Sequence, residues 1–461
     1  MKRILALCAL LIPLPAMGAA RVDWKVVEKE ATDYLQQYLR IDTTNPPGNE
    51  TAAAKYLQSL LEKEAIRCRL LESKPGRGNL FAYIDTGGKK RPIILLNHID
   101  VAPAERRYWK EDPFAGVVKD GSVWGRGAID DKSLGMAQLM TMLLLKRTKA
   151  KLNRQVIFLA VADAEGGSSA GAGWITSTKE HKTLIERAEF LLGQGSVIRM
   201  SEGKVAYYGV SPTEKTTCWL ELRAKGPAAL AAFPPFEPTA IEKLAMALQR
   251  IFAFKSEVKL VPTVEKFFQD LSKLQVGERK QQFLNIRESI KNAGFLSAVE
   301  KNPDYGPMLK STVAVTSFNT PGSRASIIPA EATATLDCRL LPGESPLDFV
   351  SKLQTLMDGT GVEVHPLLLG ESSLSPVTTD LFKAIVKIAG QYDKGAIVTT
   401  PLLANSTDAG YFRKLGITCY GFEPFKLETA QQLGHSNDER IPLASYLGGV
   451  RRMYDLVLAA Q

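Results

Sequence analysis

The sequence predicts an α/β fold whose functional residues gather at one edge of a central sheet. An apolar run at 93–96 stops at His98-Ile99-Asp100, and a second run at 156–162 ends in Asp163-Ala164-Glu165. Between them, 132–147 is rich in Leu and Met and is predicted to be a core helix. Alternating strands and helices favour a sheet with parallel strands, and such sheets carry their sites at the carboxyl ends of the strands.

Histidine and carboxylate residues stand at these strand ends. His98 and Glu165 follow the two apolar runs, and Asp130 lies in the loop just before the predicted helix. Zinc accepts imidazole nitrogens and carboxylate oxygens as ligands, so we predict a site for zinc or another divalent metal at this edge. A plain core histidine is the alternative for His98, and the neighbouring Asp100 and Asp130 disfavour it.

Two helices are predicted ahead of the first apolar run. The segments 23–39 and 51–64 have the helical spacing of apolar residues. The sequence Pro46-Pro47-Gly48 lies between them and is expected to end the first helix and turn the chain. A further strand is predicted at 80–85.

The first 20 residues have the pattern of a secretory signal peptide. Lys2 and Arg3 precede an apolar segment at 4–14, and Gly18-Ala19-Ala20 offers small residues for cleavage. The apolar segment is too short to span a bilayer. We expect residues 1–20 to be removed and the protein to be secreted or periplasmic; a buried strand that stays in the protein is the alternative.

The composition is that of a soluble globular protein. Hydrophobic residues make up 45% of the chain, which is enough for a large core, and no later segment reaches spanning length. The net charge is +9, but Lys and Arg are spread along the chain, so we expect neither nucleic acid nor a membrane as a partner. Cys68, Cys218, Cys338 and Cys419 lack metal-type spacing, and we expect most of them to be buried free thiols, although export would permit disulfides.

The region 214–367 is predicted to be a separate α+β domain. Strand-like and amphipathic helical segments alternate in it, at 218–224, 240–252, 311–318, 332–340 and 347–357. The chain then continues with 368–461, which contains the late histidine His435.

Three motifs together resemble those of a known family. His98-Ile99-Asp100-Val101-Ala102-Pro103 is similar to its first motif, Gly125-Arg126-Gly127-Ala128-Ile129-Asp130 to its second, and Leu433-Gly434-His435 to its last. The chain thus resembles the M20 family of zinc peptidases and amidohydrolases, in the carboxypeptidase S-like and succinyl-diaminopimelate desuccinylase-like branch. The resemblance covers nearly the whole chain after residue 20. It implies a zinc-peptidase-like catalytic domain with a central mixed sheet, formed by 21–213 and 368–461 and interrupted by an α+β lid at 214–367.

The resemblance also implies which residues bind metal. One ion would take Asp130, Glu165 and His435, and a second would take His98, Asp130 and the residue at Gln194. Family members have a carboxylate at that last position, and a neutral amide is a weaker ligand, so we expect one ion rather than two. Asp100 corresponds to the residue that orients His98.

Two further catalytic positions depart from the family pattern. Ala164 stands where family members have the Glu that acts as general base, and Leu230 stands where their lid has a His that stabilises the oxyanion. Neither side chain can perform that role. Arg324 is a candidate for binding a substrate carboxylate, with an ordinary surface Arg as the alternative.

These features leave two functions open. The first is an exported M20-like metallohydrolase, a peptidase or N-acyl amino acid amidohydrolase with impaired or altered catalysis, in which Asp163, Glu165 or the metal would replace the missing base. The second is a non-catalytic homologue that binds a peptide, an amino-acid ligand or a partner protein in the former cleft. The substitutions favour the second function, and the intact ligands favour the first. The lid also implies a homodimer.

Overall fold

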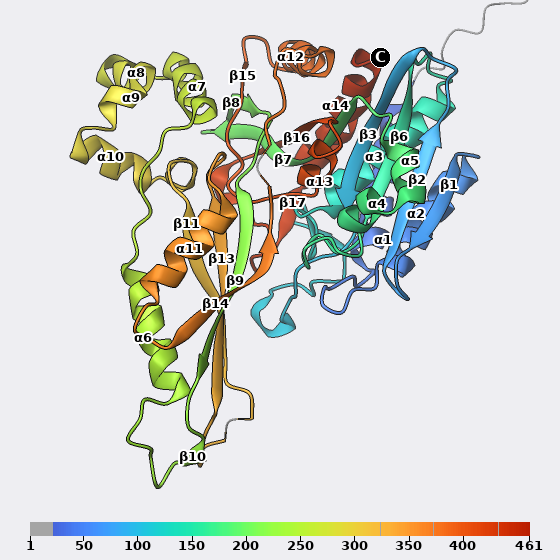
Figure 1. Cartoon of the computed structure of the whole chain (residues 1–461). Helices are drawn as coiled ribbons and strands as arrows, with labels where there is room; N and C mark the ends of the chain where they lie inside the picture. Colours follow the sequence, from blue (N-terminus) through green and yellow to red (C-terminus); the bar gives the residue numbers. More distant parts are fainter. Residues whose placement is uncertain (1–21, 323, 372, 432) are drawn as a thin grey trace, which may run out of the picture.

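The structure is a computed structural model that describes residues 22–461 except Ser323, Ser372 and Gln432. The predicted signal peptide therefore lies outside the described residues. A larger α/β domain and a smaller lid make up most of the fold, and the lid extends away from the larger domain (Figure 1).

An eight-stranded mixed sheet forms the centre of the larger domain, as the sequence predicted. The strand order is β1-β2-β6-β3-β7-β8-β15, and β16 also pairs with β7. Strand β3 is parallel to β6 and β7, β16 is parallel to β7, and β15 is parallel to β8. The pairs β1–β2, β2–β6 and β7–β8 are antiparallel. The strands are β1 (Arg67–Glu72), β2 (Gly78–Ile84), β3 (Lys90–His98), β6 (Arg154–Val161), β7 (Phe190–Ser201), β8 (Lys204–Gly209), β15 (Ile397–Thr399) and β16 (Thr418–Leu427).

Helices cover both faces of this sheet. Side chains of β3 alternate between two cores, with Ile93 and Leu95 in one and Ile94 and Leu96 in the other. The first core is closed by α1 (Trp24–Leu39), α2 (Glu50–Lys63), α3 (Lys132–Arg147), α12 (Asp380–Tyr392) and α14 (Leu443–Ala459). The second is closed by α4 (Ala172–Ser177), α5 (Lys179–Ile185) and α13 (Ala409–Arg413).

The lid is a four-stranded antiparallel sheet with helices on one face. Its order is β11-β13-β9-β14, and α6 and α11 pack on the face that carries the alternate apolar residues of β9 and β13. At its far end, the short strands β10 and β12 pair with each other (Figure 1). These elements are β9 (Thr216–Lys225), β10 (Ala229–Leu230), α6 (Ala240–Ala253), β11 (Thr312–Asn319), β12 (Ile327–Ile328), β13 (Glu331–Leu340), α11 (Pro346–Leu356) and β14 (Val362–Leu369).

Four helices between α6 and β11 form a bundle that the sequence analysis did not anticipate. They are α7 (Pro262–Leu271), α8 (Gly277–Leu284), α9 (Ile286–Ser289) and α10 (Ala293–Glu300), with the 3-10 turns η2 (Ser272–Leu274) and η3 (Gly306–Met308). The bundle is inserted in the sequence of the lid but shares a core with Tyr207 and Leu402 of the larger domain. Arg199 also pairs with Asp304 at 3.0 Å, so the bundle joins lid and larger domain.

A small sheet completes the larger domain beside the site. Its order is β17-β5-β4, with β4 (Val117–Lys119), β5 (Ser122–Trp124) and β17 (Arg440–Pro442). The 3-10 turns η1 (Arg106–Tyr108) and η4 (Thr429–Gln431) lie in connecting loops. Another loop, residues 125–131, connects β5 to α3.

Two other expectations can be compared with the fold. Cys218, Cys338 and Cys419 are buried free thiols, as predicted, and Cys68 is a partly buried one. Among the residues that the structure describes, no helix has both the length and the apolar character needed to cross a bilayer.

The bundle supplies a test of its packing. Phe268 is fully buried and makes edge-to-face contacts with Phe283 and Tyr305 at centroid distances of 5.2 and 5.3 Å. Phe268→Ala should therefore lower the free energy of unfolding by about 3–5 kcal/mol, measured by urea denaturation. Val276→Ala is the control, because Val276 lies in the same bundle, is 85% exposed and should change stability by less than about 0.5 kcal/mol. Equal effects of the two substitutions would contradict this packing.

Candidate metal centre

Four side chains from four separate segments of the chain meet in one cleft. His98 ends β3, Asp130 precedes α3, Glu165 follows β6, and His435 precedes β17. All four line a cleft of about 660 Å³ between the larger domain and the lid. The parallel arrangement of β3 and β6 explains part of this convergence, because both strands end at the same edge of the sheet.

The distances between these side chains suit metal ligands. His98 Nε2 lies 2.8 Å from Asp130 Oδ1, and His435 Nε2 lies 2.8 Å from Glu165 Oε1 and 3.3 Å from Asp130 Oδ2. One ligand atom each of His98, Asp130 and Glu165 falls within 4.8 Å of the other two. Imidazole nitrogens and carboxylate oxygens in this arrangement fit a divalent cation such as zinc.

The electrostatics of the cluster attract positive charge. Burial opposes ionisation of Asp130, but hydrogen bonds with His435 and His98 outweigh it and hold the pKa of this carboxyl below its ordinary value. Hydrogen bonds to Asp130 and Glu165 raise the pKa of His435 to about 10. The carboxylates therefore stabilise a cation at this point of the cleft.

Asp100 supports the site in two ways. Its backbone carbonyl lies 2.9 Å from His98 Nδ1, whereas its carboxylate is 3.5 Å from that nitrogen. The carboxylate instead accepts hydrogen bonds from the backbone N–H groups of Ala164 and Glu165, both at 3.0 Å. The backbone of Asp100 thus orients His98, and its side chain holds the loop that carries Glu165.

Gln194 and Ala164 face the same cleft. The amide nitrogen of Gln194 donates a hydrogen bond to Asp130 Oδ1 at 2.6 Å, so its nitrogen rather than its oxygen points at this carboxylate. Asp130 Oδ1 is also the oxygen nearest to His98. Ala164 contributes only a methyl group to the cleft wall and has no proton to exchange.

The lid provides the opposite wall of the cleft. Trp219, Arg339 and Leu368 lie on it, and the guanidinium of Arg339 pairs with Asp337 at 2.7 Å and contacts Ser406. The lid comes close to the Glu165 loop at Gly167, where an added Cβ would lie 3.4 Å from both Leu368 and Trp219. The cleft therefore has a metal-type cluster on one side and a cation with an indole ring on the other.

Comparisons with known proteins identify the family. The profile of peptidase family M20/M25/M40 matches residues 94–459, which includes every residue of the cluster. The chain belongs to this family. Its members are metal-dependent hydrolases of the peptidase and aminoacylase type, in agreement with the cluster.

Relatives and solved structures match along most of their length. Aminoacylase-1 of Sus scrofa is 27% identical, over 94% of this chain and 95% of the relative. The N-fatty-acyl-amino acid synthase/hydrolase PM20D1 of Mus musculus is 24% identical, over 95% of this chain and 90% of the relative. The M20 family metallo-carboxypeptidase Sso-CP2 of Sulfolobus solfataricus shares the fold with a TM-score of 0.70 and 21% identity, covering 94% of this chain and 99% of that structure.

Two residues named from sequence lie away from the M20 cleft of this chain. Leu230 is in β10 and pairs with Ile327 at the far end of the lid, where its side chain is 53% exposed. Arg324 is exposed and forms a β-bridge with Ile327 in the same region, so the structure does not bring it to the cleft. Arg339, which the sequence analysis did not select, is the arginine that lines the cleft.

Glu423 is a second residue that the sequence analysis missed. It lies in β16, lines the cleft, and accepts a hydrogen bond from the Gly195 backbone N–H at 3.0 Å. Burial raises the pKa of its carboxyl to about 8. The sequence could have identified Glu423, because it is the single carboxylate within the otherwise apolar stretch 419–425.

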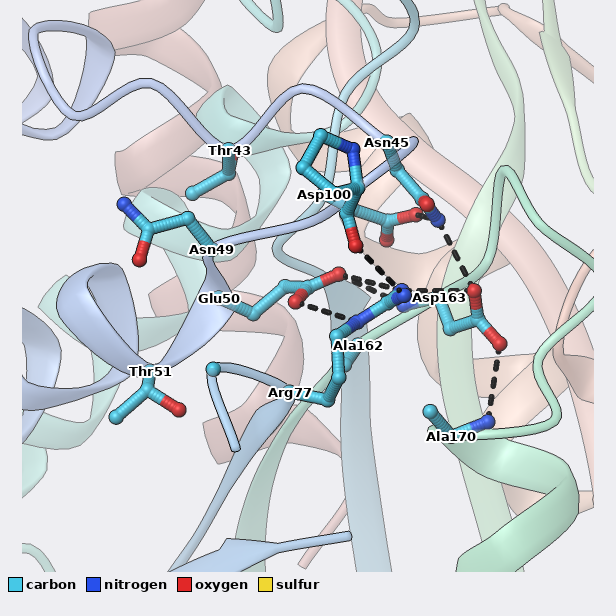
Figure 2. A network of polar contacts seen from close by, with 12 residues as sticks. Thr43, Asn45, Asn49, Glu50, Thr51, Arg77, Asp100, Ala162, Asp163 and Ala170 are labelled. Atoms are coloured by element: carbon cyan, nitrogen blue, oxygen red, sulfur yellow. Dashed lines mark hydrogen bonds and ion pairs between the residues drawn. The ribbon is translucent and has the colours of Figure 1, made fainter. Parts of the chain in front are cut away.

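A polar network behind the cluster fixes the loop after β6 (Figure 2). Arg77 pairs with Asp163 at 2.7 Å and with the fully buried Glu50 at 2.8 Å, and Asn45 bridges Asp163 and Asp100 at 3.0 and 2.8 Å. The carboxylate of Asp163 is thus occupied by these partners and does not line the cleft. It is therefore poorly placed to act as a general base in the cleft.

This network generates a stability prediction. Arg77→Met removes the cation between two carboxylates with little solvent access, so it should lower the free energy of unfolding by about 3–5 kcal/mol. Arg69→Met is the matched control, since Arg69 pairs with Glu180 at an exposed site and should cost no more than about 1 kcal/mol. Urea denaturation of both variants is the measurement. A loss for Arg77→Met no larger than the control would show that the network does not hold this loop.

Proposed function

We propose that this chain is an exported M20 hydrolase of amide bonds in small peptides or N-acyl amino acids, with one tightly held divalent ion, zinc being the first candidate, and with reduced catalysis. The observation that carries the proposal is the convergence of His98, Asp130, Glu165 and His435 in one cleft. A divalent cation in such a site supplies Lewis-acid polarisation of the scissile carbonyl.

We prefer one ion because the two carboxylate oxygens of Asp130 have different neighbours. Asp130 Oδ2, Glu165 and His435 form a set of three ligands with intact chemistry. On the other side, His98 and the Gln194 amide both occupy Asp130 Oδ1, and the amide adds no negative charge. A cation is therefore held more weakly beside His98 than beside His435.

The walls of the cleft support a substrate with a carboxylate and an apolar part. Arg339 places a guanidinium in the cleft, and because its Nε and Nη2 already pair with Asp337 at 2.7 and 2.9 Å, a substrate carboxylate would bind at Nη1, beside Ser406. Trp219, Leu368 and Leu403 provide apolar surface in the same cleft. N-acyl amino acids and small peptides combine these features, and the names of aminoacylase-1 and PM20D1 point to the same class.

Reduced catalysis follows from what the cleft lacks. Positioned proton transfer contributes typically about 10²–10⁴-fold, and Ala164 cannot provide it. A missing oxyanion donor costs about 10²–10³-fold, and Leu230 cannot provide that interaction from a partner subunit.

Homodimerisation through the lid is supported by the exposed apolar side chains of Leu230, Phe233 and Phe236 at its far end. Export is supported only by the pattern of residues 1–20.

A non-catalytic binding protein is the second candidate function. Two observations favour it: the methyl group of Ala164 at the cleft wall and the amide of Gln194 that donates to Asp130. In this case the cleft would hold a peptide or amino-acid ligand, or a partner chain, without hydrolysis.

Restoring the two residues distinguishes the candidates. Ala164→Glu should raise hydrolysis of a panel of N-acyl amino acids and dipeptides by about 10²-fold or more, because it returns a proton-transfer group. Gln194→Glu should raise metal content towards two ions per chain, because it returns a carboxylate ligand. The double variant should show both changes, measured by substrate turnover and elemental analysis.

Each single variant serves as the control for the other. Ala164→Glu should leave the metal content unchanged, and Gln194→Glu alone should give little turnover. No turnover by the unmodified protein, together with no turnover by a double variant that binds two ions, would contradict the hydrolase proposal and favour the binding protein. Unchanged metal content in Gln194→Glu would contradict the placement of Gln194 as a former ligand.

A further inference from the structure

Arg126 lies at a point where three loops of the site meet. Its guanidinium is 98% buried and donates from Nη1 to Glu439 Oε2 at 2.6 Å and to the Ser436 carbonyl at 3.2 Å. Its Nη2 donates to the carbonyls of Pro103 at 3.2 Å and His435 at 3.4 Å. One side chain thus connects the loop after β3 with the loop before β17.

Glu439 extends this connection to the loop before α3. Its Oε1 accepts hydrogen bonds from the backbone N–H groups of Ile129 at 2.6 Å and Asp130 at 3.0 Å. Its own carbonyl accepts from the Gly125 N–H at 3.0 Å. The fully buried carboxylate therefore holds the backbone of the residue whose side chain lies at the centre of the metal cluster.

The two histidines of the cluster depend on this arrangement to different degrees. The His98 side chain is 5% exposed and is held by the Asp100 carbonyl, whereas the His435 side chain is 54% exposed. Packing therefore does little to orient His435, and its backbone has a φ of +61° that only a few residue types adopt readily. Arg126 holds the carbonyl of His435 and of the next residue in this conformation.

We infer that Arg126 and Glu439, here called the Arg126–Glu439 clamp, are positioning residues that set Asp130 and His435 at the mutual distance needed to bind a metal ion. The inference rests on the proposed function for the identity of the ligands. The clamp touches neither substrate nor ligand side chains; it acts through the backbones of residues 129, 130, 435 and 436. Groups that orient metal ligands from behind typically affect metal affinity by about 10–100-fold.

Two substitutions test the clamp. Arg126→Lys keeps a positive charge near Glu439, but a single ammonium cannot reach three carbonyls at once. Glu439→Gln keeps the size of the side chain and removes its charge. Both folded variants should bind zinc about 10–100-fold more weakly than the unmodified protein in a titration against a competing chromophoric chelator at fixed pH. If Glu439→Gln does not fold, Arg126→Lys decides the test.

Arg154→Gln is the matched control for the loss of a buried guanidinium. Arg154 is 1% exposed and pairs with Glu189 at 2.9 Å, but it lies at the start of β6, at the other end of the strand from the Glu165 loop. We expect this variant to lose stability without a comparable loss of zinc affinity. An equal loss of affinity in the control would overturn the inference, because the effect would then reflect general destabilisation.

A double-substitution cycle separates positioning from a merely structural role. On a His435→Ala background, Arg126→Lys should cost less than about threefold in zinc affinity, since the ligand that it positions is gone. The same 10–100-fold loss on both backgrounds would overturn the inference. Unchanged zinc affinity in the folded clamp variants would overturn the inference about the clamp but not the proposed function. No zinc uptake by the unmodified protein would overturn both.

Discussion

The fold holds the carboxylates of Asp130 and Glu165 near one another in a cleft of limited solvent access. These two negative charges repel each other unless positive charge lies between them. Two imidazoles lie between and beside them, and His435 contacts both carboxylates. Each candidate ligand comes from a different segment, one from the end of β3 and three from loops, so no single element can fix their separation. The polar side chains behind the cluster supply that constraint, through Asp100 and Asn45 on one side and Glu439 and Arg126 on the other.

The supporting framework behind the cluster is fully paired. Arg77, Glu50 and Asp163 form a complete network, and Asp100 keeps its contacts with the loop that carries Ala164. On that loop, however, Ala164 has only a methyl group, which cannot transfer a proton. Under the proposed function, the chain keeps interactions that position the candidate metal ligands but lacks a proton-transfer group at position 164. This separation explains why metal binding and hydrolysis have to be measured independently.

Much of the fold and part of the site could be predicted from sequence. The apolar runs before His98 and Asp163 predicted parallel strands because both runs end in polar ligands, and β3 and β6 do lie side by side. The helix predicted at 132–147 has the same bounds in α3 because a segment rich in Leu and Met is bounded by polar residues, Asp130-Asp131 before it and Thr148-Lys149 after it. The motifs placed His98, Asp130, Glu165 and His435, and the structure brings them together.

Other features depend on contacts between segments far apart in the chain. The bundle α7–α10 packs on Tyr207 and Leu402, and nothing in its own sequence indicates that surface. Glu423 and Arg339 line the cleft because of the positions of β16 and β13 in their sheets. Arg324 lies beside Ile327 at the far end of the lid. Local patterns do not show which of these arginines faces the cleft, because that depends on how the lid strands lie against the larger domain.

The measurement that tests the central claim most directly is the metal content of the purified protein, determined by elemental analysis beside a His435→Ala variant. The account predicts about one divalent ion per chain in the unmodified protein and a large loss in the variant, because His435 completes the intact ligand set with Asp130 and Glu165. Two tightly held ions in the unmodified protein, or the same content in both proteins, would contradict it.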